Sequence, residues 1–417
     1  HGHPDPQGGP IMSSSAHQTP TPQGVTVATT AHDHGSKSRI APEEIAVGVV
    51  VGRTSEYFDF FVFGIAAVLV FPHVFFPFAD GLKGLLYAFT IFSFAFISRP
   101  FGTALFMNVQ RRWGRSVKLT AALFVLGTAT AGMAFLPGYA VLGDRAIWLL
   151  AFFRLIQGIG FGGSWDGLPS LLAMNAPPQR RGWYSMMGQL GAPIGFIIAA
   201  GLFLFLHWSL ESDDFLTWGW RYPFYVAFAV NVVALFARLR LVVTHEYTEM
   251  LEEGQLEPIS TREMVRSQGY NIFLGAFAAL ASYALFHLVT VFPLSWVALQ
   301  NTQDLNSVLI VQLCGAAIAI VCTVISGRIA DRIGRRTTLG LFAIFIGIFA
   351  LFAPYLMGGD STRQDIFILV GFALLGLSYG QAAGTVTSNF EQRFRYTGAA
   401  LTTDFAWMFG AAFAPLV

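Results

Sequence analysis

The chain contains little charge and little cysteine. Only 12% of its 417 residues are Asp, Glu, Lys or Arg, about half of the share in a soluble globular protein. The 25 basic and 24 acidic residues nearly balance, which leaves no excess of positive charge for binding nucleic acid. The two cysteines, Cys314 and Cys322, lie within one apolar run and indicate neither disulfides nor a metal site. This composition excludes most soluble enzymes and secreted disulfide-rich proteins, and we expect no metal and no cofactor.

Long apolar segments take the place of the missing charge. Hydrophobic residues make up 54% of the chain, and its mean hydropathy is +0.57. A helix that crosses a membrane needs about 20 mostly apolar residues. Segments of this kind predict eleven membrane-spanning helices, at residues 45–71, 84–107, 118–137, 147–173, 182–206, 220–237, 270–297, 306–328, 337–357, 366–389 and 397–417. The expected fold class is an all-α membrane protein that crosses the bilayer many times.

The basic residues between these segments gather in alternate loops. The loops after even-numbered segments hold Arg111, Arg112, Arg115, Lys118, Arg180, Arg181, Arg332, Arg335, Arg336, Arg393 and Arg395. Loops of the other parity hold only Lys83, Arg145 and Arg363, with Arg221 at the edge of the sixth segment. Because loops rich in Lys and Arg stay in the cytoplasm, the pattern predicts that these loops and the N-terminus are cytoplasmic.

The two ends of the chain carry further expectations. Residues 1–40 are rich in Ser, Thr, Gln, Pro and His and have no long apolar run, so we expect a disordered cytoplasmic tail. Eleven segments place the C-terminus on the other side of the membrane from the N-terminus. We therefore expect a twelfth membrane-spanning helix beyond residue 417 in the intact protein.

A short pattern occurs twice in the chain. Residues 110–118 follow the second segment and residues 327–336 follow the eighth, and their Gly-Arg pairs, Gly114-Arg115 and Gly334-Arg335, are 220 residues apart. Two similar halves are typical of a pseudo-symmetric secondary transporter. We expect a six-helix bundle at 41–237, a cytoplasmic linker at 238–269 and a second bundle, with about five helices present, at 270–417.

The second copy of the pattern has a recognisable form. Its Gly-x-x-x-Asp-Arg-x-Gly-Arg-Arg resembles the signature of the major facilitator superfamily. The resemblance implies that Asp331 pairs with charges and dipoles at helix ends, in a contact that opens during transport. In the first copy, Arg111 stands where the aspartate belongs. The resemblance implies the same gating role for Arg332, Gly334, Arg335 and Arg115.

Further motifs narrow the resemblance to the metabolite:proton symporter branch of that superfamily. They are Glu56-Tyr-Phe-Asp-Phe60, Arg99-Pro-Phe-Gly102, Arg154-Leu-Ile-Gln-Gly158, Gly191-Ala-Pro193, Trp218-Gly-Trp-Arg-Tyr-Pro-Phe224 and Arg395-Tyr-Thr-Gly398. Members of this branch move citrate, 2-oxoglutarate, shikimate, dicarboxylates, or proline and betaine. The resemblance implies two six-helix halves related by pseudo-two-fold symmetry, working by alternating access, in a transporter rather than an enzyme.

Charged residues lie inside several predicted spans, where each costs about 2.5–3.5 kcal/mol. In the first span Arg53, Glu56 and Asp59 follow one another at intervals of three residues, so we expect all of them near one helix face. Two neighbouring carboxylates in a partly dry cavity resist double ionisation, which suits reversible protonation. We predict that Glu56 and Asp59 couple transport to protons. The alternative is that they only pair with arginines and hold helices together.

The fourth span adds a second group of candidates. Arg154 stays charged in any surroundings, so it can bind a substrate carboxylate. Members of the family usually carry Glu after the Gly-Gly pair, whereas this chain has Ser164 there and Asp166 two residues later. We predict substrate contacts for Arg53, Arg154 and Gln157 and a proton-coupling role for Asp166, with internal ion pairs as the alternative.

Five more residues complete the set of candidates. Arg99, His287 and Asp404 lie within spans and are candidate substrate contacts. Arg99 could instead snorkel or pair at a gate, His287 could serve only in packing, and Asp404 needs a partner. Gly191 and Pro193 resemble the bend that major facilitators place between their halves, so we expect a conformational role for both.

Together these features predict proton-coupled uptake of a small organic acid across the inner (cytoplasmic) membrane by a monomer. Three arginines within spans favour an anionic substrate, since a neutral or zwitterionic osmolyte needs fewer cations. The expected partners are a carboxylate substrate, protons and lipid, with no nucleic acid. The alternatives are an osmolyte symporter of the proline/betaine type, an exporter, or a transporter-like sensor. Stimulation of uptake by high osmolarity would indicate the osmolyte symporter, and binding without counterflow the sensor.

Overall fold

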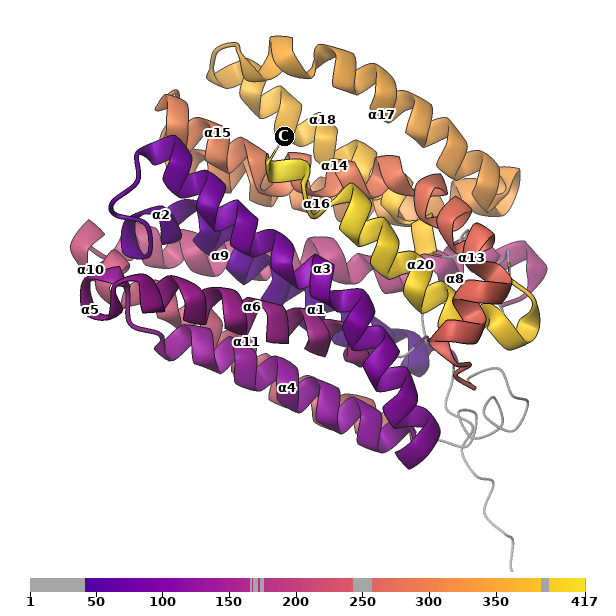
Figure 1. Ribbon diagram of the computed structural model, residues 1–417. Coiled ribbons are helices and arrows are strands. Elements are labelled where there is room, and N and C mark those ends of the chain that lie inside the picture. Colours follow the sequence, from indigo (N-terminus) through magenta and orange to yellow (C-terminus); the bar gives the residue numbers. More distant parts are fainter. Residues whose placement is uncertain are drawn as a thin grey trace, which may run out of the picture. The chain divides into compact units, whose positions relative to one another are not determined.

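Figure 1 shows a computed structural model of the chain. The structure describes residues 42–165, 167, 172, 176–242, 257–383 and 390–416. Within these ranges the chain forms helices and connecting loops, and no strand. The expected tail, residues 243–256 of the expected linker and the candidate Asp166 lie outside the described residues.

The first six predicted spans are helical in the structure. Their helices are α1 (Pro42–Leu69), α3 (Gly81–Trp113), α4 (Arg115–Phe135), α6 (Asp144–Ser164), α8 (Arg181–Met187) followed by α9 (Gly191–Ser209), and α11 (Tyr222–Val242). Short helices α2 (Phe71–Val74), α5 (Tyr139–Leu142) and α10 (Ser212–Thr217) lie between them. The prediction that the fourth span continues to residue 173 is wrong. Helix α6 ends at Ser164, because the backbone of Trp165 is extended and Gly167 has a φ of +74°.

The remaining predicted spans are helical over most of their described residues. Their helices are α13 (Thr261–Ala278), α14 (Leu280–Thr290), α15 (Phe292–Gln300), α16 (Leu305–Ile333), α17 (Arg335–Met357), α18 (Ser361–Tyr379) and α20 (Arg395–Gly410). The prediction that the eleventh span continues as a helix to residue 417 is wrong, because its helix ends at Gly410. Residues 384–389 of the predicted tenth span lie outside the described residues.

The seventh span, predicted as one helix, is divided into α13, α14 and α15. One cause is Pro293, which has no N–H to donate to the carbonyl of Val289. The side-chain amide of Gln312 donates to that carbonyl instead, at 3.2 Å.

Eight stretches of helix within the described ranges are long and apolar enough to cross a membrane. Helix α1 is not among them, because Arg53, Glu56 and Asp59 interrupt its apolar run. Helix α20 is not among them because it has only 16 residues. These two helices contain four of the predicted site residues, Arg53, Glu56, Asp59 and Asp404.

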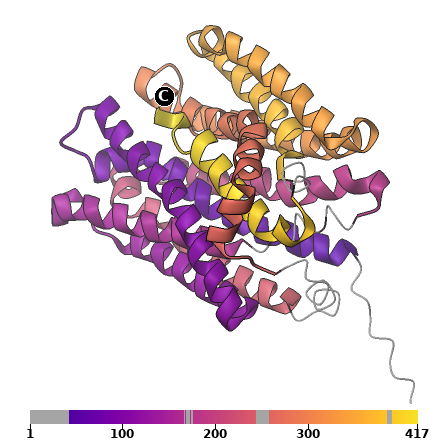
Figure 2. The ribbon, with the colours of Figure 1, turned by 45° about the vertical axis from the view of Figure 1, so that its right-hand side comes forward.

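The described helices form two groups. Helices α1, α3, α4, α6, α9 and α11 pack against one another in the first group, and α13, α14, α16, α17, α18 and α20 pack in the second. The groups meet along two seams: α16 packs against α8 and α9, and α20 packs against α3. In Figure 1 and Figure 2 the yellow helix α20 lies beside the violet helix α3.

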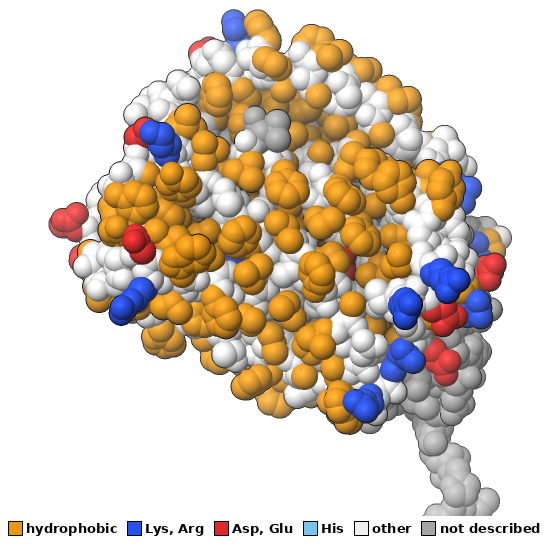
Figure 3. Space-filling model, in the orientation of Figure 1, with side chains coloured by type: hydrophobic (Ala, Val, Ile, Leu, Met, Phe, Trp, Pro, Cys, Tyr) orange, Lys and Arg blue, Asp and Glu red, His pale blue; other side chains and the backbone are white. Residues whose placement is uncertain are grey.

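Hydrophobic side chains are spread over the middle of the face drawn in Figure 3, where few charged side chains appear. Trp148 is 75% exposed and Leu351 is 80% exposed, as expected for side chains that face lipid. Most Lys and Arg side chains of this face lie at one end of the helices. We call the end with the α3–α4 and α16–α17 loops the basic end.

The repeated Gly-Arg pair occupies the same position in both groups. Gly114 connects α3 to α4, and Gly334 connects α16 to α17. Both glycines have a positive φ, +85° and +89°, which other residues rarely adopt. Helices α3 and α16 also begin alike, because Asp80 and Asp304 each accept a hydrogen bond from a backbone N–H of the first turn. The internal repeat expected from the sequence is confirmed by these matching helix ends.

Replacing Gly334 by alanine is expected to destabilise the protein by about 1 kcal/mol, because the positive φ strains any residue with a Cβ. Gly340→Ala is the matched control. Both positions have nothing within 4 Å of an added Cβ, but Gly340 lies inside helix α17. Alanine should therefore stabilise at Gly340 by about 0.5–1 kcal/mol. Thermal unfolding in one detergent measures both, and equal midpoints would contradict the conformational role of Gly334.

Candidate functional site

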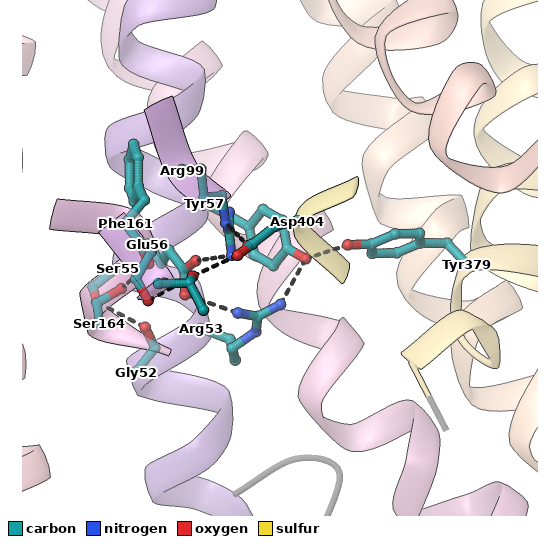
Figure 4. Close-up of polar contacts among 12 residues, drawn as sticks. Gly52, Arg53, Ser55, Glu56, Tyr57, Arg99, Phe161, Ser164, Tyr379 and Asp404 are labelled. Atoms are coloured by element: carbon teal, nitrogen blue, oxygen red, sulfur yellow. Dashed lines mark hydrogen bonds and ion pairs between the residues drawn. The ribbon is translucent and has the colours of Figure 1, made fainter. Parts of the chain in front are cut away.

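Four charged side chains from three helices form a buried network, drawn in Figure 4. On α1, Nη1 of Arg53 lies 2.8 Å from Oε2 of Glu56. On α3, Arg99 lies 3.3 Å from Glu56 through Nη2 and 2.7 Å from Asp404 of α20 through Nε. The hydroxyl of Thr103 donates to the second oxygen of Asp404. Two positive and two negative charges balance, which is how ionisable groups are accommodated inside a bilayer.

This network joins the two groups of helices. Arg99 belongs to the first group and Asp404 to the second, and neither side chain is more than 5% exposed. A second link continues from Arg53, which donates to the hydroxyl of Tyr57 at 3.1 Å. That hydroxyl is hydrogen-bonded to the hydroxyl of Tyr379 on α18. The predicted candidates Arg53, Glu56, Arg99 and Asp404 therefore occupy one continuous cluster across the seam.

Asp59 belongs to a different cluster, inside the first group. Its carboxylate is fully buried and accepts hydrogen bonds from three neutral side chains. These are the hydroxyl of Thr130 on α4 at 2.9 Å, the amide of Gln157 on α6 at 2.9 Å and the amide of Asn231 on α11 at 2.8 Å. No Lys or Arg lies within ion-pair distance of Asp59 in the described part of the chain.

The expectation that Glu56 and Asp59 form a carboxylate pair is wrong. Three residues fall short of a full helical turn by about 60°. Glu56 therefore points toward α3 and α20, whereas Asp59 points toward α4, α6 and α11. Each carboxylate has its own partners. Any proton-coupling role of Glu56 or Asp59 therefore depends on those partners and not on repulsion between the two carboxylates.

Arg154 is the neighbour of Asp59 in the first group. Its guanidinium is fully buried and donates to two neutral acceptors: the carbonyl of Phe92, at 3.3 Å, and the side-chain oxygen of Gln157. Its Cζ lies 3.9 Å from the centre of the Phe63 ring. Gln157 thus accepts from Arg154 and donates to Asp59, which connects the two charges through one amide. In the described residues no carboxylate lies within 4 Å of Arg154.

His287 lies among aromatic rings at the junction of the two groups. Its imidazole stacks on Phe60 with ring centres 5.3 Å apart and contacts the edge of Phe92 at 5.0 Å. Trp407 of α20 lies beside it, with ring centres 6.1 Å apart. Among the described residues, the imidazole nitrogens and the indole N–H have no hydrogen-bond partner. A buried polar group left in this state costs about 1–3 kcal/mol.

Asp331 makes a contact with a helix end, as the resemblance implies. Its Oδ1 accepts from the backbone N–H of Gly182 at 2.7 Å and of Trp183 at 3.3 Å, at the start of α8. The carboxylate thereby satisfies amides that have no partner within the helix. The contact joins α16 to α8 at the basic end. Opening of this contact during transport stays a prediction.

The first copy of the repeat has a different contact at the equivalent place. Lys118 of α4 donates to the hydroxyl of Tyr396 at 3.0 Å, and this hydroxyl donates to Gln110 of α3 at 2.8 Å. Lys118 also donates to the carbonyl of Trp165 at 2.7 Å. Tyr396 lies in the first turn of α20, so the contact again joins the two groups. This contact is made by a lysine, a phenol and a neutral amide, whereas the contact of the second copy is made by the carboxylate of Asp331.

Replacing Tyr396 by phenylalanine is expected to lower stability by about 1–3 kcal/mol, because it removes two hydrogen bonds and leaves buried Lys118 and Gln110 with fewer partners. Tyr270→Phe is the control, since Tyr270 is 75% exposed. Thermal unfolding of both variants in detergent measures the loss. A midpoint for Tyr396→Phe equal to that of the control would show that this contact contributes nothing.

The other predicted gating residues lie near these contacts. Arg332 is in the last turn of α16, and Arg335 and Arg115 begin α17 and α4. At Gly191 an added Cβ would lie 2.7 Å from the Cβ of Arg53, so helix α9 approaches α1 closely there. Pro193 borders a small pocket between α9 and helices α14, α16 and α18. In the described parts of the chain, no three His, Cys, Asp or Glu side chains are arranged to bind a metal ion.

Sequence reasoning missed the neutral members of these clusters. They are Thr103, Gln110, Thr130, Asn231, Tyr396 and Trp407. One signal was available, because Tyr396 lies within a motif shared with the symporter branch. For the others, a polar side chain inside an apolar run was the only indication.

The comparisons with known proteins agree with this architecture. The sequence profile of the Major Facilitator Superfamily matches residues 140–415. An inner membrane metabolite transport protein of Escherichia coli strain K12 is 34% identical over 398 residues, covering 94% of this chain and 90% of the relative. The shikimate transporter of the same strain is 28% identical and covers 94% of this chain and 90% of its own length. A proline/betaine transporter of Salmonella typhimurium strain LT2 is 26% identical, covering 84% of this chain and 72% of the relative.

Solved structures share the fold. The proton:xylose symporter XylE, bound to 6-bromo-6-deoxy-D-glucose, aligns with a TM-score of 0.67 at 18% identity. The alignment covers 90% of this chain and 87% of that one. XylE of Escherichia coli in a partially occluded, inward-open conformation gives a TM-score of 0.66 at 17% identity, with 90% of each chain covered. The chain belongs to the major facilitator superfamily, and it is a multi-pass membrane transporter for a small molecule rather than an enzyme.

Proposed function

We propose that the protein couples entry of a small carboxylate to entry of protons, with Arg154 binding the substrate and Asp59 carrying the proton. The observation that supports this most directly is the bridge through Gln157. Its amide connects a buried guanidinium to a buried carboxylate that are not in direct contact. Both charges lie inside the first group of helices, away from water.

The charges of this cluster are only partly compensated. The hydrogen-bond partners of both Arg154 and Asp59 described above are neutral groups, so each ion depends on the other, across Gln157, for its counter-charge. An isolated ion at this depth is costly. A carboxylate that arrives at Arg154 would supply a closer negative charge than Asp59 does.

This arrangement makes the binding of substrate and proton interdependent. When a substrate carboxylate occupies Arg154, the negative charge of Asp59 loses its counter-charge, and a proton on Asp59 restores neutrality. When Asp59 is protonated, Arg154 has lost its counter-charge and binds a negatively charged substrate more strongly. Each ligand therefore favours the other, with a coupling free energy of about 1–3 kcal/mol in typical cases. This mutual preference is the requirement for symport.

The contacts between the two groups supply the conformational part of the proposal. The Arg99–Asp404 ion pair, the Asp331 contact and the Tyr396 contact all connect the groups. We propose that the basic end and the N-terminus are cytoplasmic, because loops rich in Lys and Arg stay on that side. We further propose that the helices of 41–237 and of 270–417 act as the two rocking bundles of a monomer. Opening toward the cytoplasm then requires these contacts to separate.

The test uses the full chain in proteoliposomes with an inward proton gradient. Labelled mono-, di- and tricarboxylates, proline and betaine are offered with and without a protonophore. Accumulation of a carboxylate that collapses with the protonophore supports the proposal. Arg154→Lys, which keeps the charge but not the planar guanidinium, should weaken substrate binding about tenfold or more. Uptake that is insensitive to the protonophore would contradict the coupling.

An osmolyte symporter of the proline/betaine type is the second candidate. It is favoured by the aromatic rings around His287, because ring faces attract quaternary ammonium groups. It is also favoured by the similarity to a proline/betaine transporter. Accumulation of betaine in preference to every carboxylate, with stimulation by high osmolarity, would decide for it.

A further inference from the structure

We infer that a groove on the lipid-facing side of α3 and α6 binds one zwitterionic phospholipid, with an acyl chain in the groove and the phosphate at Arg145. None of the residues that line this groove belongs to the charge network or to the Asp59 cluster. The inference therefore goes beyond the proposed function and does not depend on it.

The groove has a volume of about 310 Å³, which is within the range of pockets that bind small molecules. Its walls come from the α2–α3 loop, from α3 and from α6. Figure 1 shows α2 and α5, which adjoin the starts of α3 and α6, at the end opposite the α3–α4 loop. The lining includes Phe78, Tyr87, Thr90, Phe94, Trp148 and Ala151.

The groove lies beside a tight contact between the same two helices. An added Cβ at Gly158 would lie 2.2 Å from the carbonyl oxygen of Ala95, so α6 approaches α3 closely there. All the glycines of α6 lie in its second half. In the first half Ala151 lines the groove, and on α3 the lining residue Phe94 directly precedes Ala95. The groove thus begins where the close contact of the two helices ends.

Lipid surrounds the protein at this depth. Helices α3 and α6 are both long and apolar enough to cross a membrane, and Phe78 and Trp148 are 56% and 75% exposed. From Tyr87 to Phe94 the groove follows α3 for about 10 Å. The hydrocarbon of one leaflet is about 15 Å thick. The groove therefore matches an acyl chain of one leaflet, whereas a membrane-spanning helix of a partner would cross both leaflets.

The walls of the groove suit an acyl chain. The hydroxyl of Thr90 donates to the carbonyl of Leu86 at 2.8 Å, so it needs no partner in the ligand. Tyr87 and Trp148 lie toward the starts of their helices, where aromatic side chains border the lipid head groups. Within a bilayer, apolar surfaces gain little by leaving lipid, so van der Waals contact in a shaped groove has to hold the chain.

The mouth of the groove has one charge of each sign on α6. Asp144 and Arg145 precede Trp148 by four and three residues, so both lie on its side of the helix. In the described part of the chain Arg145 has no ion pair, whereas Lys83 at the start of α3 pairs with Asp80 at 3.3 Å. A phosphate fits Arg145 and the positive end of the helix dipole. An ammonium group fits Asp144, so the pair matches a head group with both charges.

The test measures phospholipid binding to the full chain in detergent by native mass spectrometry. The probes are dioleoylphosphatidylethanolamine, dioleoylphosphatidylglycerol and dioleoylglycerol, which have the same acyl chains and different heads. We expect the first phosphatidylethanolamine to bind the wild type with a Kd about tenfold lower than either other probe. Arg145→Gln should reduce the preference over dioleoylglycerol to about twofold or less. Arg363→Gln, which removes an exposed arginine of the second group, should keep the wild-type preference.

Thr90→Trp tests the groove itself. Thr90 is exposed, so a larger side chain there occupies the groove and leaves the core unchanged. The variant should weaken binding of every probe about tenfold, because the acyl chain loses its contacts. Thr128→Trp is the matched control. Thr128 is also exposed, and it lies on α4 within about 15 Å of the same end of the bundle, outside the lining of the groove.

The affinities of Thr128→Trp should equal those of the wild type, and thermal unfolding in detergent alone verifies that both tryptophan variants are folded. Equal affinities of Thr90→Trp and Thr128→Trp would overturn the assignment of the groove. Tighter binding of phosphatidylglycerol than of phosphatidylethanolamine would overturn the zwitterionic head. A dimer that Thr90→Trp dissociates would assign the groove to a second copy of the chain and overturn the inference as well.

Discussion

Asp59→Asn is expected to abolish proton-driven accumulation of substrate. Exchange of substrate between the two sides of the membrane should continue. Asparagine stays neutral, as the protonated carboxyl would be, so the variant can hold substrate at Arg154 but cannot release a proton. One coupled proton supports about tenfold accumulation for each unit of pH across the membrane. We expect this factor to fall to about one in the variant. The measurement is the steady-state accumulation ratio in proteoliposomes, with counterflow assayed beside it.

Asp360→Asn is the control for removing a carboxylate from the chain. Asp360 is 69% exposed and pairs with Arg363 at 3.5 Å on the surface, so its loss should change neither accumulation nor counterflow. In the Asp59→Asn variant, the new amide has to turn its NH2 group toward one of the donors that now face the carboxylate, which makes a measured unfolding midpoint necessary. Full accumulation by a folded Asp59→Asn protein would show that another carboxylate carries the proton. Glu56 would then be the next residue to replace.

Arg99→Leu is expected to be the most destabilising change in the charge network, by about 3–5 kcal/mol. It leaves Asp404 and Glu56 buried without the guanidinium that lies between them. It also removes an ion pair from the α3–α20 seam. The measurement is thermal unfolding in detergent.

The double variant Arg99→Leu/Asp404→Asn tests whether the loss comes from the uncompensated charge. Neutralising Asp404 should recover part of the stability, because the buried carboxylate is no longer charged. Lys83→Leu is the control, since the Lys83–Asp80 pair is more than 60% exposed on both sides and should contribute less than about 1 kcal/mol. Additive losses in the double variant would show that Arg99 and Asp404 do not act as a pair.

Much of the fold was predictable because a bilayer restricts what a chain can do. A backbone without water must satisfy its hydrogen bonds internally, so every long apolar segment becomes a helix. The repeat was predictable for a similar reason. A sharp connection between two helices favours glycine, because glycine adopts a positive φ without strain. Gly114 and Gly334 have a positive φ at this connection in both copies.

The breaks within helices were not predictable to the same degree. Pro293 was visible in the sequence, but its effect depends on Gln312, which lies on another helix and takes over the carbonyl of Val289. Without such a partner the carbonyl would stay unpaired at bilayer depth, because Pro293 has no N–H to donate to it. Helix ends such as Ser164 likewise depend on residues that follow, in this case the extended Trp165.

The candidate site was predictable as a set of residues but not as an arrangement. Charged residues are so costly inside a bilayer that Arg53, Glu56, Asp59, Arg99, Arg154 and Asp404 were all evident from the sequence. Which of them pair was not evident, because Arg99 and Asp404 are 305 residues apart and meet only across the seam. The neutral partners of Asp59 gave no comparable signal, because a single Thr, Gln or Asn in an apolar helix can also serve only in packing.

The sequence by itself determined the class of protein, the order of its helical segments, the internal repeat and the family, since all of these follow from local composition and short motifs. The tertiary structure alone decided how the charges divide. It placed Glu56 in the network with Arg99 and Asp404, and it left Asp59 beside Arg154 with only neutral side chains in contact. The physical reason is that a turn of about 60° along one helix directs two carboxylates at different neighbouring helices, and packing chooses those neighbours.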